Sequence, residues 1–126
     1  MRTLVLLLAL LAGQGTAIAD YAPGYDAKVA ASYVGKYILI GITYVDAKGT
    51  ELRQEQIHGV IESVSEGGIR VKLKGANEGQ YRSIPSDLRG IRKAKPGRYS
   101  LRGTREVIVD PDLVTTWRFT EGDPSK

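Results

Sequence analysis

The chain of 126 residues contains no cysteine, and it has only one histidine, one methionine and one tryptophan. The lack of cysteine excludes disulfides, thiol catalysis, thiolate metal sites and covalent haem attachment. With His58 as the single histidine, a metal site built from several imidazoles is excluded as well. A small exported domain without disulfides fits a bacterial periplasmic or secreted protein better than a eukaryotic extracellular module.

Export itself is predicted by the first nineteen residues, MRTLVLLLALLAGQGTAIA. One basic residue, Arg2, precedes an apolar run over residues 4–12. The small residues Ala17 and Ala19 then meet the requirement of signal peptidase, so we expect cleavage before Asp20. The run is about half the ~20 residues of a membrane-spanning helix, which disfavours an uncleaved membrane anchor.

The remaining residues are expected to form one domain. We interpret residues 20–35 as an N-terminal tether with helical potential over residues 26–33. Residues 36–120 are expected to form the folded domain, and residues 121–126 a disordered tail.

Strand patterns predict a meander of three strands and a candidate fourth strand in the first half of this domain. Residues 36–46 are the strongest candidate, with Ile38, Ile40 and Ile42 on one face. Residues 51–65 form a long strand that Gly59 interrupts, and we expect a bulge there that bends the sheet. Residues 69–74 complete the meander, and residues 80–84 are a candidate fourth strand.

The second half predicts one helical turn and three further strands. The turn covers residues 85–91, and Ser86 is its expected cap. The strands cover residues 98–102, 106–110 and 113–120. The sequence therefore predicts an all-β fold, a small curled sheet or barrel of about six short strands with one short helical turn. The order of these elements resembles that of SH3-like and Sm-like barrels. This resemblance implies no particular function.

Charge is the most informative functional signal after the export signal. Residues 70–105 contain eleven lysines and arginines against two acids, Glu78 and Asp87, while the whole chain has 18 bases and 14 acids. A field of this kind attracts an anionic partner, and export makes lipopolysaccharide phosphates or acidic lipids better candidates than nucleic acid. The candidate binding residues are Arg70, Lys72, Arg82, Arg89, Arg92 and Lys93.

Two alternatives remain open. The basic residues can serve only as a solvated outer face that pairs with acids on neighbouring strands. Alternatively, the protein docks on another protein through an exposed strand edge or the polar segment from Gln54 to His58. Binding driven by charge weakens steeply with salt, whereas strand addition does not.

No pattern in the sequence points to catalysis. His58 lies near Glu55 but has no nucleophile motif around it, and the acids Glu106, Asp110 and Asp112 lack the spacing of a calcium loop. There is no phosphate-binding glycine motif and no dinucleotide fingerprint. We therefore predict a non-enzymatic protein without catalytic residues, cofactor or metal.

Overall fold

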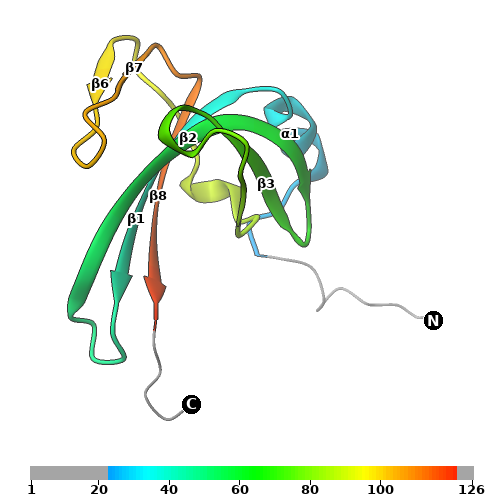
Figure 1. The fold of residues 1–126 in the computed structure, drawn as a ribbon. Helices are drawn as coiled ribbons and strands as arrows, with labels where there is room; N and C mark the ends of the chain where they lie inside the picture. The colour runs from blue at the N-terminus through cyan, green and yellow to red at the C-terminus, as the bar shows by residue number, and fades with distance from the viewer. Residues whose placement is uncertain (1–22, 122–126) are drawn as a thin grey trace, which may run out of the picture.

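The computed structural model describes residues 23–121, which form a strongly curled sheet with one α-helix beside it (Figure 1). The predicted signal peptide, the first three residues of the tether and residues 122–126 of the tail lie outside the described residues. The main sheet has six strands in the order β4-β3-β2-β1-β8-β5, and β6 and β7 form a separate two-stranded sheet.

Helix α1 and the meander occupy the first half of the described chain. Helix α1 spans Ala27–Tyr33, and the carboxylate of Asp26 caps it by accepting hydrogen bonds from the backbone N–H groups of Lys28 and Val29. The strands are β1 (Tyr37–Val45), β2 (Glu51–Ser65), β3 (Gly68–Leu73) and β4 (Tyr81–Ile84). All four lie where the sequence predicts strands.

The second half extends the sheet beyond β1 and adds a separate hairpin. Two 3₁₀ turns, η2 (Gly75–Asn77) and η3 (Leu88–Gly90), flank β4, and the short strand β5 (Arg92–Lys93) follows. Strands β6 (Arg98–Ser100) and β7 (Val107–Val109) form a hairpin at the end of the sheet remote from the β1–β2 turn (Figure 1). Strand β8 (Leu113–Thr120) then returns to pair with β1 in parallel.

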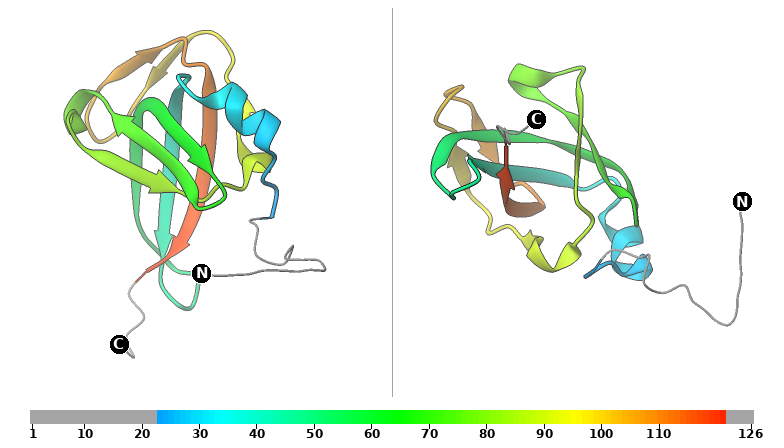
Figure 2. Two further views of the ribbon diagram at one scale, coloured as in Figure 1. Left: turned by 90° about the vertical axis from the view of Figure 1, so that its right-hand side faces the viewer. Right: turned by 90° about the horizontal axis from the view of Figure 1, so that it is seen from below.

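The core lies on the concave face of the curled sheet (Figure 2). Alternation places Ile38, Ile40 and Ile42 of β1 on this face, and all three are buried. The same rule holds in β3, where Ile69, Val71 and Leu73 are buried while Arg70 and Lys72 are exposed. A smaller cluster of Leu39, Leu101 and Ile108 covers part of the opposite face. Strand β1 is therefore apolar on both sides because both of its faces are packed against other apolar residues.

Two local predictions are wrong. The irregularity in the pairing of β2 with β3 lies between Ile61 and Ser63 rather than at Gly59. Gly59 instead allows close approach of β3, because a Cβ atom there would overlap the carbonyl oxygen of Lys72. The cap of η3 is Asp87, whose side chain accepts from the N–H of Arg89, since the hydroxyl of the buried Ser86 donates to the carbonyl of Glu66.

The described chain is thus mostly β with one helix, and the curled sheet is open, with β4 and β5 as its edges. This agrees with the curled-sheet alternative of the sequence prediction. Among residues 23–121, no helix has the length and apolar character that crossing a bilayer requires.

Candidate functional site

The structure divides the six predicted binding residues among three places. Arg70 and Lys72 lie on the outer face of β3, where Arg70 pairs with Glu62 and its guanidinium lies 4.0 Å from the ring centroid of Tyr81. Arg82 points to the other face, because it stands opposite the buried Val71 in the β3–β4 ladder. The remaining three residues lie along η3 and β5.

Arg82 belongs to a satisfied ion pair rather than to an open basic surface. Its two terminal nitrogens donate to the two carboxylate oxygens of Glu55, each over 2.9 Å, and the hydroxyl of Tyr44 also donates to Glu55. The hydrogen bonds from Arg82 lower the pKa of the Glu55 carboxyl and raise that of the guanidinium. This bidentate pair connects β4 to β2 across the concave face.

The three bases after β4 differ in how they are paired. Arg89 is held by the carboxylate of Asp87, with bonds of 2.8 and 2.6 Å. Arg92 and Lys93 are exposed, and the structure gives neither of them an ion pair within residues 23–121. Because the two are consecutive in strand β5, their side chains point to opposite sides of it, and Lys93 lines a pocket.

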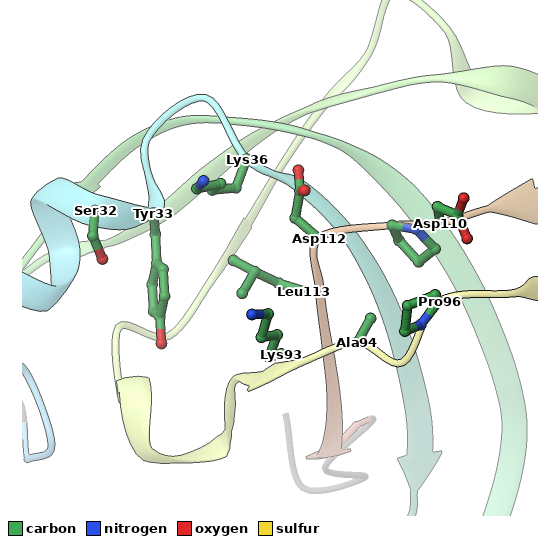
Figure 3. Close-up of a pocket in the computed structure, with 10 residues that line it drawn as sticks. Ser32, Tyr33, Lys36, Lys93, Ala94, Pro96, Asp110, Asp112 and Leu113 are labelled. Atoms are coloured by element: carbon green, nitrogen blue, oxygen red, sulfur yellow. The ribbon is translucent and has the colours of Figure 1, made fainter.

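This pocket lies between the end of α1, strand β5 and the start of β8, and its volume is about 630 Å³ (Figure 3). Its size is within the range of small-molecule sites in proteins. The apolar part of the lining consists of Ala94, Pro96, Pro111 and Leu113. Ser32 and Tyr33 contribute hydroxyl groups from α1.

Two lysines supply the positive charge of the pocket. In Figure 3 the side chain of Leu113 lies between those of Lys36 and Lys93. Neither ammonium group has a carboxylate within ion-pair distance in the described part of the chain. Lys36 precedes β1 by one residue, and the sequence prediction did not include it because it lies outside the basic segment.

The two carboxylates of the pocket are turned to backbone amides. Asp112 accepts from the N–H of Tyr37 over 2.8 Å, and Asp110 accepts from the N–H of Gly97 over 2.7 Å. Asp110 also has a φ of 50°, a left-handed conformation that aspartate tolerates better than most residues. Both carboxylates are therefore engaged with backbone N–H groups.

A second polar constellation lies at His58, which is 5% exposed. Its Nδ1 atom is 2.7 Å from the hydroxyl of Tyr37, and its Nε2 atom is 2.7 Å from a carboxylate oxygen of Glu106. The other oxygen of Glu106 accepts from the N–H of Ala76 over 2.6 Å. The sequence alone did not reveal this arrangement, because Glu106 lies 48 residues away from His58 along the chain.

The environment shifts the pKa values of two side chains in this constellation. The hydrogen bond with His58 lowers the pKa of the Glu106 carboxyl, and burial together with the charge of Glu106 raises the pKa of Tyr37. His58 is hydrogen-bonded to both Tyr37 and Glu106, and the constellation joins β1 and β2 to the β6–β7 connection.

Three or more metal-ligating side chains do not gather at any point within residues 23–121. Comparison with known proteins gives no relationship from which a role can be inferred, since no family model, curated protein or solved structure matches this chain. The chemistry of the pocket at Lys36 and Lys93 is therefore the basis for the functional proposal.

Proposed function

We propose that this protein is an exported, non-catalytic binding module of the cell envelope that holds an anionic ligand between Lys36 and Lys93. The observation that carries the proposal is a pocket of about 630 Å³ that contains two ammonium groups without carboxylate partners among residues 23–121. An anion with a phosphate or carboxylate group can accept hydrogen bonds from both lysines.

The apolar lining favours an amphipathic anion over a fully hydrophilic one. Leu113 and Ala94 are buried at the floor, and Pro96 and Pro111 extend the apolar surface. A ligand that joins an acidic group to an aliphatic chain would contact both parts of the pocket. Acidic lipids of the envelope have this chemistry, in agreement with the export signal.

The N-terminal pattern of residues 1–19 supports the envelope location, and the succession of β1 to β4 and η3 supports an SH3-like or Sm-like arrangement of the sheet. The exposed Arg92, next to Lys93 in the chain and without an ion pair among residues 23–121, adds positive potential that attracts the ligand.

The test is calorimetric titration of the protein with octyl phosphate, with octyl glucoside as the uncharged comparison. The double variant Lys36→Gln and Lys93→Gln should weaken octyl phosphate binding about 100-fold or more, since a hydrogen bond to a charged group contributes about 1.5–3 kcal/mol. Binding by the parent should also weaken as salt is added.

The matched control is Lys48→Gln with Lys72→Gln, which removes the same charge from exposed positions that do not line the pocket. It should bind octyl phosphate within about threefold of the parent, because distant exposed charges are screened. Equal losses in the two double variants, or no binding of octyl phosphate by the parent, would refute the pocket as the binding site.

A further inference from the structure

Strand β2 has a strand neighbour on both sides only near its middle. Residues 59–65 pair with β3, whereas residues 51–58 pair with β1 alone. The neighbouring chain leaves β2 at Lys74, whose N–H donates to the carbonyl of His58 over 2.9 Å. The first half of β2 is therefore an open edge of the sheet.

The backbone groups that face this edge follow from antiparallel alternation. The carbonyl of His58 points toward β3, while the N–H of Ile61 donates to Lys36 on the β1 side. In an antiparallel strand the N–H and C=O groups of one residue point to the same side, and successive residues alternate between the two sides. Near His58, the residues at even positions therefore direct both groups away from β1. Gln54 and Gln56 are such residues, and no backbone hydrogen bond to them from this side occurs within residues 23–121.

A slot of about 330 Å³ borders this edge. Gln54, Glu55 and Gln56 line it on the side of β2, and Asn77 together with residues 101–104 lines it elsewhere. The side chain of Gln56 accepts from the N–H of Arg102 over 2.8 Å, which joins the two sides. Because further residues of this chain also border the slot, it suits a single extended segment better than the whole sheet of a second copy.

The charges around the slot favour an acidic segment. Glu55 is already paired with Arg82, whereas the exposed Arg102 has no ion pair in the described part of the chain. A second hollow of about 200 Å³ shares Gln54, Gln56 and Arg102 with the slot and lies over Gly41.

We propose that the open edge of β2 binds an extended peptide by strand addition, with an acidic side chain of the peptide beside Arg102. The backbone of Gln54 and Gln56 supplies the hydrogen bonds, and Arg102 supplies the preference for acid. This site is separate from the lysine pocket and stands whether or not that pocket binds an anion.

The test begins with selection of peptides from a displayed random twelve-residue library against the exported protein. Selected peptides should be enriched in aspartate or glutamate, and Arg102→Gln should weaken their binding about tenfold or more. Gln54→Pro should abolish binding, because proline removes an N–H that faces the edge and leaves the bonds of Arg53 and Glu55 to β1 in place. Gln54→Ala is the matched control, since it removes the side chain and keeps the N–H, and it should weaken binding far less than Gln54→Pro does.

Circular dichroism must show that the proline variant is folded. If it is not folded, a second experiment methylates the backbone amides of a selected peptide one at a time. Methylation of every second amide should abolish binding, because these N–H groups face β2, whereas methylation of the amides between them should have no effect. The proposal is overturned if the library yields no enriched peptide, if the folded proline variant binds as the parent does, or if methylation shows no alternation. It is also overturned if the edge proves to be occupied by a second copy, seen as a dimer that Gln54→Pro dissociates.

Discussion

Gly59 and Gly41 show how one residue type serves different purposes at two strand positions. Both have backbone angles that other residues adopt, so neither is required for a left-handed conformation. A Cβ atom at Gly59 would overlap the backbone of Lys72 and Leu73 in β3. A Cβ atom at Gly41 would meet only the Cγ2 atom of Thr116, at 3.7 Å.

The first prediction compares alanine at these two glycines. Gly59→Ala should destabilise the fold by about 1–3 kcal/mol, because β3 must move away from β2 to make room. Gly41→Ala should leave the stability unchanged or raise it by up to about 1 kcal/mol, because alanine loses less backbone entropy on folding. Urea denaturation measures both, and equal effects would mean that β3 does not approach β2 closely at Gly59.

At the scale of elements, the contact between the main sheet and the β6–β7 hairpin has an apolar and a polar part. The apolar part is the cluster of Leu39, Leu101 and Ile108. The polar part is the constellation of Tyr37, His58 and Glu106. A buried polar group that loses its partner costs about 1–3 kcal/mol, so the polar part fixes where the hairpin lies on the sheet.

The second prediction concerns the pH dependence of this contact. The hydrogen bond with His58 lowers the pKa of Glu106 in the folded state, so the carboxylate stabilises the fold at pH values above the unfolded pKa of about 4.3. This contribution is lost as the pH falls through the lower pKa of the folded state. The stability lost between pH 7 and pH 3 should therefore be smaller in Glu106→Gln than in the parent.

Urea denaturation at the two pH values measures the difference. Glu51→Gln is the control, because Glu51 is exposed and has no ion pair within residues 23–121. It should lose as much stability as the parent on acidification. If Glu106→Gln does the same, the carboxylate does not stabilise the folded state through His58.

At the scale of the whole molecule, the charge is distributed less simply than the sequence suggests. Of the six predicted binding residues, Arg70, Arg82 and Arg89 have carboxylate partners. This agrees in part with the alternative in which the basic residues form a solvated outer face and pair with acids on neighbouring strands. Lys93 is the member of the set that lines a pocket, and it does so together with Lys36 from outside the basic segment.

The third prediction concerns processing of the chain. Mass spectrometry of the protein recovered from the envelope or medium of an expressing bacterium should show an N-terminus at Asp20, because Ala17 and Ala19 meet the peptidase requirement. Replacing Ala19 with a bulky residue, Ala19→Phe, should leave a larger precursor. A product that retains Met1 with either sequence would contradict the export signal.

The sequence by itself determined the positions of β1 to β4 and of β8, and the facing of the side chains in β1. These features depend on alternation between neighbouring residues, which is local. Strand β5 could not be predicted, because its two residues form a strand only by pairing with β8.

Only the tertiary structure decided which distant segments meet. The parallel pairing of β8 with β1 places Asp112 at Tyr37, 75 residues earlier in the chain, and thereby forms the pocket of Lys36 and Lys93. The same holds for His58 and Glu106, and for the slot beside Gln54. Such contacts depend on how the whole sheet curls. The alternating pattern of one strand is compatible with pairing to several other strands, and the arrangement that buries all apolar faces in one core determines which strands pair.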